Sequence, residues 1–511
     1  MQLAAESVNR QADDVATFSK LAEGGFNRTF LATMKDGFKL VARIPYLSTQ
    51  PRRLLIASEV ATLGFLRSNG LPVPEVYGYS AVAENPAGTE YMFLEFIGGI
   101  NLGDIWYDLS EQSRLKFLHN LVDFESRLFD LRFPASGSLY CKKDMESLAG
   151  IDIPSDASSD TAYCIGADTS QHLWHRRGCE IECSRGPCMY LSTSCSNSKI
   201  AYRSLDYNAE AALTAGAEKE LAYIRKFGRP LHPYNKVRRE LYGYQKLDPR
   251  IHITSIQTYL QIAHLLIPKE REMSEPTIRH PDLQPSNIFV SATLDIVGVI
   301  DWQHAVILPL FLQSGIPDSL QNYSDPVSDA LTLPSLPANI DSLEAKQQLQ
   351  EQEILRKRQL HYHYFRETAM QNPVHQAALM VEMAVLRRKI FRHASDPWEG
   401  DNISLQADIV QLQKFWLRIS SAPCPLSHEQ HEAAEILRLS EAQQDADNQL
   451  VTCYEAIGVG KDGWVPAEHY KEARQRALKF KEDAFADEDD EEDALAKEHW
   501  IFDDFDEDEY E

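Results

Sequence analysis

The segment His280–Gln303 holds the side chains best suited to chemistry. It reads H-P-D-L-Q-P-S-N-I-F-V, continues through a short polar turn and ends in V-G-V-I-D-W-Q. This pattern predicts a loop followed by two apolar strands that pair as a hairpin. Such a hairpin returns Asp301, at the end of the second strand, to the neighbourhood of Asp282 and Asn287.

These three side chains supply the groups that phosphoryl transfer requires. The reaction needs oxygen ligands that hold Mg²⁺ on the phosphates, and a carboxylate that orients and deprotonates the attacking hydroxyl. Asp282 is the candidate base, and Asn287 and Asp301 are the candidate metal ligands. An Asp followed five positions later by an Asn is also common in ordinary turns. The motif therefore gains its weight from the elements around it.

Two neighbours of these residues have more structural interpretations. His280 stands two positions before Asp282 and could be mistaken for the base. We expect it instead to brace the loop through backbone hydrogen bonds. Trp302, directly after Asp301, is interpreted as a packing residue.

The first hundred residues have the pattern of a small sheet with one helix. Alternating apolar residues, an Asp-Gly turn at Asp36-Gly37 and an Asn-Gly stop at Asn69-Gly70 mark the ends of the elements. We expect strands at 29–34, 38–44, 75–79 and 91–96, with a helix at 58–68 between them. Residues 1–100 are therefore predicted to form an N-terminal lobe.

From Leu102 the pattern changes to helices, which predicts a second, mainly helical lobe over 101–420. Residues 136–198, rich in Ser, Cys, Gly and Asp, are expected to be a long irregular insertion. A helical extension over 421–481 and an acidic tail over 482–511 complete the predicted organisation. The helices expected in these parts are 114–132, 210–227, 256–266, 347–359, 375–393, 405–419, 429–445 and 466–483.

The order of these features resembles a known family. H-x-D-x-x-x-x-N followed by a strand-borne I-D-W is similar to the catalytic and metal loops of the aminoglycoside phosphotransferase and choline kinase group, relatives of protein kinases. The resemblance implies an α+β, bilobal protein-kinase-like fold that uses ATP and Mg²⁺ to phosphorylate a hydroxyl group. It names no substrate, and the nucleotide and an unidentified hydroxyl-bearing molecule are the partners it implies.

Within this group the chain most resembles large fungal phosphotransferase-domain proteins, including those of the altered-inheritance-of-mitochondria type. The matching stretches run from L-A-E-G-G-F-N-R near the N-terminus to F-D-D-F-D-E-D-E-Y at the end, and include H-A-S-D-P-W-E-G-D-N. This likeness implies a mitochondrial association, although the N-terminus lacks the Arg-rich, acid-poor composition of a transit peptide. Without it, the cytoplasm is the expected location.

The resemblance assigns the nucleotide site to the N-terminal lobe. Gly24, Gly25 and Asn27 lie where the family has its phosphate-covering turn, whose backbone N–H groups can meet phosphate oxygens. Two glycines alone more often mark an ordinary turn. The hinge, whose backbone would bind adenine, corresponds to Glu95, Phe96 and Ile97.

Arg43 departs from the family pattern. It stands in V-A-R-I-P where the kinase group normally has a lysine that contacts the nucleotide phosphates, and Glu59 is the helix acid that would hold it. Arginine keeps the charge and can bind phosphate as a fork, but the two side chains are not interchangeable. A purely structural Arg43–Glu59 ion pair is an equally good interpretation.

Charge and cysteine content limit the remaining possibilities. Of the net charge of −25, residues 482–511 carry −16, so the other 481 residues carry only −9. Such an acidic block usually stays solvated, could bind a basic partner, and argues against nucleic-acid binding. The sequence contains no run of eighteen or more apolar residues, so it predicts no membrane span. Four of the eight cysteines have spacings that do not match a zinc site, and we interpret them as unpaired loop thiols: Cys179, Cys183, Cys188 and Cys195.

Two functions remain open. The first is an active ATP- and Mg²⁺-dependent kinase of a small hydroxyl compound, favoured by the intact Asp282, Asn287 and Asp301. The second is a weakly active or inactive kinase-like binding or scaffold protein, favoured by Arg43, the long insertion and the tail.

Overall fold

A computed structural model describes residues 1–149, 162–186, 208–460, 465, 469–485, 491–503 and 507–510. The chain divides into two compact units. The first contains Met1–Ala215 and Ile267–Val385, and the second contains Gly216–Leu266 and Leu386–Glu511. Each unit is built from two stretches of chain that are far apart in the sequence.

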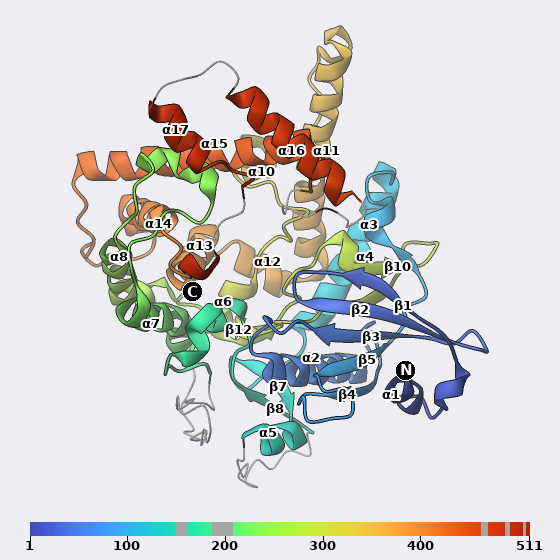
Figure 1. The fold of residues 1–511 in the computed structure, drawn as a ribbon. Helices are drawn as coiled ribbons and strands as arrows, with labels where there is room; N and C mark the ends of the chain where they lie inside the picture. The colour runs from blue at the N-terminus through green and yellow to red at the C-terminus, as the bar shows by residue number, and fades with distance from the viewer. Residues whose placement is uncertain are drawn as a thin grey trace. The chain divides into compact units, whose positions relative to one another are not determined.

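The first unit opens with a five-stranded antiparallel sheet in the order β1-β2-β3-β5-β4 (Figure 1). Its core-facing positions alternate along β2 and β3, as a half-buried sheet requires, with Ala32, Met34, Leu40 and Ala42 all buried. The predicted sheet is confirmed. Its strands are β1 (Val15–Glu23), β2 (Asn27–Met34), β3 (Lys39–Pro45), β4 (Val76–Ser80) and β5 (Tyr91–Glu95).

Two helices pack with this sheet. The predicted helix is α2 (Arg52–Ser68), which begins six residues earlier than expected and ends at Asn69 with Gly70 in the left-handed conformation (φ 75°). The other helix, α1 (Gln2–Glu6), was not predicted, and its Ala4 and Ala5 join the buried side of the sheet. The N-terminal lobe therefore begins before its first strand.

The rest of the first unit is mainly helical, and its described residues hold three small antiparallel sheets. Its helices include α4 (Glu111–Phe129) and the 27-residue α11 (Ala345–Gln371). The remaining elements are β6 (Ile100–Asn101), α3 (Leu102–Ile105), β7 (Ser138–Cys141), α5 (Lys142–Ala149), β8 (Tyr163–Gly166), α6 (Gln171–Trp174), β9 (Pro276–Ile278), β10 (Ile288–Val290), β11 (Ile296–Val299), β12 (Ile307–Pro309), α9 (Leu310–Gln313), α10 (Pro326–Asp329) and α12 (Pro373–Leu379). The predicted α+β class, with a small antiparallel sheet followed by a mainly helical part, is confirmed.

The described residues of the second unit form helices joined by loops, with one isolated bridge between Leu231 and Leu247. It contains most of α7 (Ala209–Phe227) and α13 (Ala384–Ser395), with α8 (Pro249–Ile262), α14 (Ile403–Lys414), α15 (Gln430–Ile457), α16 (Tyr470–Ala484) and α17 (Glu491–Glu498). The helix predicted over 375–393 is in fact two helices, α12 and α13. They are separated at Met383, whose left-handed backbone (φ 58°) cannot continue a helix.

Two further predictions are corrected. The described part of the 136–198 insertion is not irregular, because β7 pairs with β8 from Ser138↔Gly166 to Cys141↔Tyr163. The acidic tail is not simply solvated, since Tyr510 is 3% exposed and bonded to Arg239. Cys188 and Cys195 lie outside the described residues, and the described Cys179 and Cys183 are free thiols.

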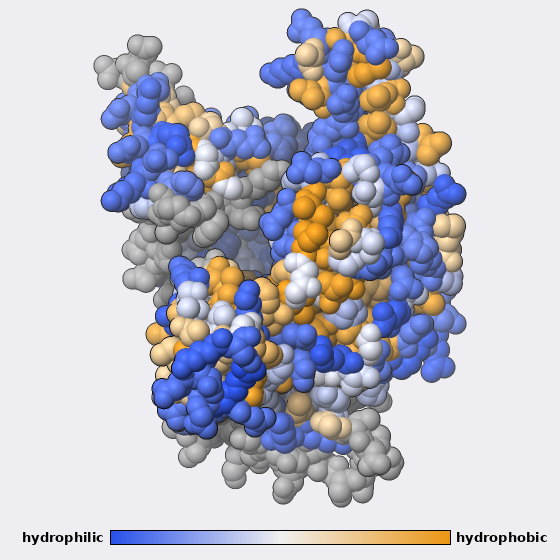
Figure 2. Space-filling model, turned by 90° about the vertical axis from the view of Figure 1, so that its right-hand side faces the viewer, coloured by the Kyte–Doolittle hydropathy of each residue, from blue (hydrophilic) through white to orange (hydrophobic). Residues whose placement is uncertain are grey.

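The surface is largely hydrophilic. Figure 2 shows one face of the molecule, where apolar residues gather in patches between hydrophilic ones. Large exposed apolar side chains come from separate elements, among them Leu47, Tyr107, Leu349 and Leu417. Scattered apolar side chains of this kind are ordinary on protein surfaces. No helix in the described parts of the chain is both long and apolar enough to cross a membrane.

Candidate active site

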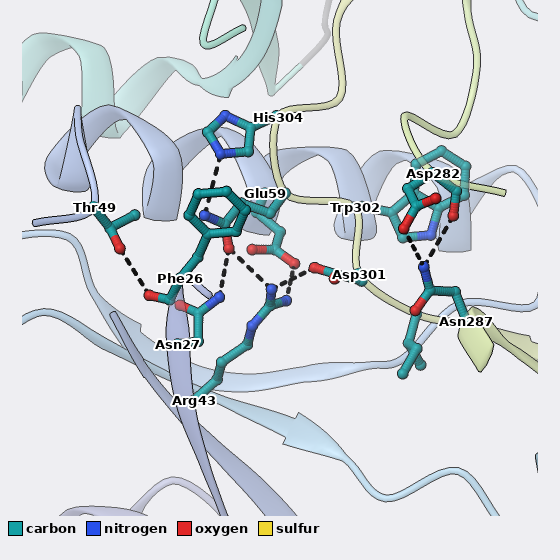
Figure 3. A network of polar contacts seen from close by, with 12 residues as sticks. Phe26, Asn27, Arg43, Thr49, Glu59, Asp282, Asn287, Asp301, Trp302 and His304 are labelled. Atoms are coloured by element: carbon teal, nitrogen blue, oxygen red, sulfur yellow. Dashed lines mark hydrogen bonds and ion pairs between the residues drawn. The ribbon is translucent and has the colours of Figure 1, made fainter. Parts of the chain in front are cut away.

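The predicted hairpin forms and brings the three candidate residues together. β10 pairs with β11, with Ile288 opposite Val299, and the Ile300 N–H donates to the Asn287 carbonyl at 3.0 Å. Asp301 follows directly, and its carboxylate points toward Arg43 (Figure 3). The Asn287 amide donates to the Asp282 carbonyl at 2.9 Å and to its carboxylate at 3.2 Å. A short, locally hydrogen-bonded segment thus assembles the acidic site.

Asp282 has the surroundings of a base. Its carboxylate is exposed and accepts a hydrogen bond from Gln284 Nε2 at 2.6 Å. Partial desolvation raises its pKa, and the charge of Asp301 adds to the shift. A higher pKa makes a carboxylate a stronger acceptor for the proton of an attacking hydroxyl.

His280 braces this loop rather than serving as its base. Its Nε2–H donates to the Ile300 carbonyl at 2.8 Å, and its Nδ1 accepts from the Asp282 N–H at 3.1 Å. The ring meets Trp302 edge-on, with centroids 4.7 Å apart. Burial lowers the His280 pKa to about 4, so the imidazole is neutral and both nitrogens are engaged. Trp302 is fully buried, as its predicted packing role requires.

Arg43 joins the N-terminal sheet to the metal loop. Its Nη1 donates to Glu59 at 2.5 Å, while its Nη2 donates to Asp301 and, at 2.9 Å, to Gln303 Oε1. The Arg43–Glu59 ion pair is therefore present. The contact with Asp301 was not predicted, and it places a guanidinium on the carboxylate that we expected to hold a metal ion (Figure 3).

The carboxylates on either side of Arg43 ionise differently. Burial raises the pKa of Glu59 to about 7, although Arg43 opposes the shift. Burial also works against ionisation of Asp301, but the charge and hydrogen bond of Arg43 together outweigh it and lower the pKa of this carboxyl. Near neutral pH, Asp301 is therefore the more firmly charged partner of Arg43.

Backbone strain is concentrated in the same loop. Asp301 (φ 65°) and His304 (φ 64°) both adopt the left-handed conformation that side chains other than glycine disfavour. Such strain persists where surrounding contacts fix the chain, and it is found most often at functional sites. Here the turn at Asp301 directs its carboxylate toward Arg43.

The predicted phosphate turn lies between β1 and β2. The Gly24 N–H donates to the Asn27 carbonyl at 3.1 Å, and the Phe26 carbonyl accepts from Tyr46 N–H and Thr49 Oγ1. A Cβ added at Gly24 or Gly25 would meet nothing within 4 Å, so packing does not require glycine there. The space beside the turn is open.

Asn27 links this turn to the metal loop. Its side-chain amide donates to Gln303 Oε1 at 2.6 Å. Turned over, the amide presents its oxygen to Arg43, at 2.8 Å from Nη2 and 3.1 Å from Nε. In either orientation Asn27 is linked to Arg43, either directly or through Gln303.

The predicted hinge lies at the end of β5. The Glu95 side chain is engaged by Arg67 at 2.9 Å and by the Glu75 N–H at 3.1 Å. Lys39 lies over the Phe96 ring. Ile97 packs so closely on Gly298 that a Cβ at this glycine would lie 2.7 Å from the Ile97 side chain. Ile97 therefore contacts the strand that carries Asp301, whereas the Glu95 side chain serves the sheet.

Gln303 and His304 are site residues that we did not predict. His304 Nδ1–H donates to the Thr169 carbonyl at 2.7 Å, and its ring meets Phe26 edge-on. Ser138 Oγ, which contacts Thr169 at the same end of the insertion hairpin, donates to the Ala305 carbonyl at 3.2 Å. The insertion thus supports the segment after Asp301. The only signal in the sequence was the position of these residues next to Asp301.

The donor set fits a hard divalent cation. Asp301 offers carboxylate oxygens and Asn287 an amide oxygen, the ligand types that Mg²⁺ prefers. No group of three His, Cys, Asp or Glu residues suited to a metal occurs among the described residues. The side chain of Asp301 is 45% exposed, which leaves room for an incoming ion.

The turn D-P-W-E-G-D-N belongs to the second unit and is structural. Trp398 is buried, its backbone N–H donates to Glu220 at 2.7 Å, and its indole N–H donates to the Arg229 carbonyl at 3.0 Å. Asp401 accepts from Arg238 at 3.2 Å. These contacts hold α7, the segment after it and the turn together.

Comparison with known proteins identifies the family of the chain. The model of the phosphotransferase enzyme family matches residues 17–311, more than half of the chain. The chain therefore belongs to this family and has a phosphotransferase-type fold. A subtelomeric hrmA-associated cluster protein of Aspergillus fumigatus is 31% identical over 91% of this chain and 92% of its own length.

Other similarities are more distant. The mitochondrial protein altered inheritance of mitochondria protein 9 from Candida glabrata is 26% identical over 60% of this chain and 51% of its own length. Among solved structures, a streptomycin–ATP complex of APH(2")-IIa aligns with 13% identity and a TM-score of 0.35, covering 80% of this chain and 94% of that one. A Plasmodium vivax ethanolamine kinase aligns with the same identity and TM-score, over 84% and 82%.

Proposed function

We propose that this protein is an ATP- and Mg²⁺-dependent phosphotransferase whose acceptor is a hydroxyl group of a small molecule. The observation that carries the proposal is the hydrogen-bonded pair of Asp282 and Asn287, with Asp301 next to Ile300, whose N–H donates to the Asn287 carbonyl at the end of the hairpin. Membership of the phosphotransferase enzyme family supports the same reaction class.

The residues have distinct roles in this proposal. Asp282 accepts the proton of the acceptor hydroxyl, while Asn287 and Asp301 hold Mg²⁺, which neutralises phosphate charge when bound. Asn27 and Arg43 face the phosphates, with Glu59 behind Arg43. The remaining nucleotide contacts come from Gly24 and Gly25 in the turn and from the backbone of Glu95, Phe96 and Ile97.

The proposal is tested by binding and by transfer. ATP should raise the melting temperature of the protein more with Mg²⁺ than without it. Labelled phosphate should then appear on one member of a hydroxyl-metabolite panel. Asp282→Asn should keep the ATP-induced stabilisation and lose transfer by about 10²- to 10⁴-fold, the usual contribution of a positioned base. If the wild-type protein shows no stabilisation by ATP and no transfer, the proposal is rejected.

The second candidate function is that of a kinase-like binding protein with weak or no activity. The contact between Arg43 and Asp301 favours it, because the guanidinium already neutralises the expected metal ligand. This alternative predicts that Asp301→Ala leaves cellular function intact while deletion of the C-terminal tail abolishes it. The opposite result would support the phosphotransferase.

A mitochondrial location is proposed from the relatives named as mitochondrial proteins. Imaging of a C-terminally tagged protein beside a mitochondrial marker tests it. A diffuse cytoplasmic signal would contradict it.

A further inference from the structure

The end of the chain is held in the second unit at two points. The first is an aromatic cluster in which Trp500 meets Phe485 with centroids 5.1 Å apart and Phe480 of α16 at 6.0 Å. Beside it, Lys481 Nζ pairs with the Asp503 carboxylate at 2.5 Å. This point fixes the chain where α17 ends.

The second point is a pocket for Tyr510, the last residue but one. Its hydroxyl accepts from Arg239 Nη2 at 3.0 Å and donates to the His232 carbonyl at 3.0 Å. Its ring stands edge-on to Tyr234, with centroids 5.1 Å apart. Arg239 is itself 5% exposed and also contacts His499 at 2.9 Å. Tyr510 therefore fills a preformed position in which both its ring and its hydroxyl are recognised.

Basic side chains between α7 and α8 donate hydrogen bonds to the backbone of the C-terminal segment. Lys236 Nζ donates to the carbonyls of Trp500 and Asp503, at 3.3 and 2.7 Å. Arg229 donates to the Glu509 carbonyl at 2.6 Å, and Lys246 pairs with the Glu509 carboxylate at 2.5 Å. Contacts to three backbone carbonyls depend on the path of the chain, whereas diffuse attraction between opposite charges would not.

The turn D-P-W-E-G-D-N also contacts the segment that receives Tyr510. The Tyr234 N–H donates to the Glu399 carbonyl at 2.8 Å. Gly400 (φ 88°) packs so closely that a Cβ would lie 2.0 Å from the His232 carbonyl. The segment that receives Tyr510 is therefore fixed by contacts that do not involve the tail.

We propose that residues 229–247 form a peptide-binding site, here called the tail site. Its ligand is an acidic segment that contains a tyrosine, and its occupant is the segment of this same chain that holds Trp500 and Tyr510. A tethered ligand has an effective concentration in the millimolar range, so even a modest affinity keeps the site filled. The basic partner suited to the acidic tail is then the second unit itself.

A trans-binding experiment tests this proposal on the full-length chain. In the full-length Tyr510→Ala variant, the tail should bind its own tail site more weakly. A fluorescently labelled peptide of residues 497–511 should therefore bind this variant saturably. The wild-type chain, whose site is filled, should bind the peptide at least tenfold more weakly. A control peptide with Tyr510→Ala should lose about 100-fold in affinity, and one with Tyr510→Phe about tenfold.

Two variants and a second measurement separate specific docking from general misfolding. Arg239→Ala, combined with Tyr510→Ala, should abolish peptide binding, whereas Glu509→Gln in the peptide, which weakens a half-exposed ion pair, should cost less than fivefold. In the wild-type chain, backbone amides of 499–503 and 507–510 should exchange hydrogen more slowly than in the free peptide. Equal exchange rates, or equal peptide binding by wild-type and Tyr510→Ala chains, would overturn the proposal. A concentration-dependent dimer that Tyr510→Ala abolishes would also overturn it, because the occupant would then be the tail of a second copy.

Discussion

The sharpest test of the site is Arg43→Lys. The Arg43 guanidinium uses one nitrogen for Glu59 and the other for Asp301 and Gln303, a geometry that a single ammonium cannot reproduce. We expect the lysine to keep Glu59, because this carboxylate is buried, and to release Asp301. The substitution therefore separates the two halves of the network.

The expected magnitude follows from the burial of each partner. Asp301 is 45% exposed, so losing its ion pair should lower the free energy of unfolding by only about 1 kcal/mol. Arg43→Met removes the ion pairs with both carboxylates. It leaves Glu59, whose side chain is 3% exposed, without its cation, which should lower the free energy of unfolding by about 3–5 kcal/mol when Glu59 is charged. Because the pKa of Glu59 is about 7, this larger cost should shrink below neutral pH, where the carboxyl takes up a proton.

In Arg43→Lys the affinity for Mg²⁺ should rise, although the free energy of unfolding should fall. An Mg²⁺ ion that approaches Asp301 in the wild-type chain competes with Arg43, and removing a contact of about 1 kcal/mol should raise Mg²⁺ affinity about fivefold. Isothermal titration with Mg²⁺ in the presence of a non-hydrolysable ATP analogue measures the affinity, and urea denaturation measures stability. Arg53→Lys is the matched control, because its pair with Glu84 is 54% and 73% exposed. Unchanged or weaker Mg²⁺ binding by Arg43→Lys would refute the competition.

Three further perturbations test the frame around the site. Arg279→Leu leaves Glu125, 0% exposed, as an unpaired buried carboxylate and should lower the free energy of unfolding by about 3–5 kcal/mol, measured in urea. His280→Asn should remove a pH dependence: with a pKa near 4 when folded and about 6.5 when unfolded, His280 contributes stability above pH 6.5 that is lost as the pH falls toward 4. The stability difference between wild type and variant should therefore shrink over that range, and a constant difference would contradict the assignment. Gly298→Ala should lower the melting temperature, because its Cβ would lie 2.7 Å from Ile97, and Ile97→Ala should restore part of the loss.

The features predicted from the sequence are local ones. The β10–β11 hairpin and the loop before it were recognisable because the turn, the two strands and both motif acids lie within about twenty residues, so spacing alone determines which groups meet. The sheet of the first unit was predicted for the same reason, since its hairpins are marked by an Asp-Gly turn and by alternating apolar positions. Resemblance to the family then placed these elements in order.

The features that were missed depend on contacts between distant residues. Arg43 and Asp301 are 258 positions apart, and Tyr510 and His232 are 278 apart, so no local pattern reports either contact. Composition led to the wrong prediction that the tail is simply solvated, because a strongly acidic block normally repels itself. The break between α12 and α13 has no glycine or proline to announce it, because Met383 adopts its left-handed backbone under tertiary constraint.

Arg43 connects the two candidate functions, because the same contact supports opposite conclusions. A guanidinium on Asp301 would weaken a site that must bind Mg²⁺ often, yet it also keeps a strained carboxylate ionised and in place before the ion arrives. The distinction is energetic: a half-exposed pair worth about 1 kcal/mol is easily exchanged for a divalent cation carried by ATP. A pair worth several times more would hold the site closed. The double-mutant cycle between Arg43→Lys and Asp301→Asn measures this coupling directly, and a value near 1 kcal/mol favours the phosphotransferase.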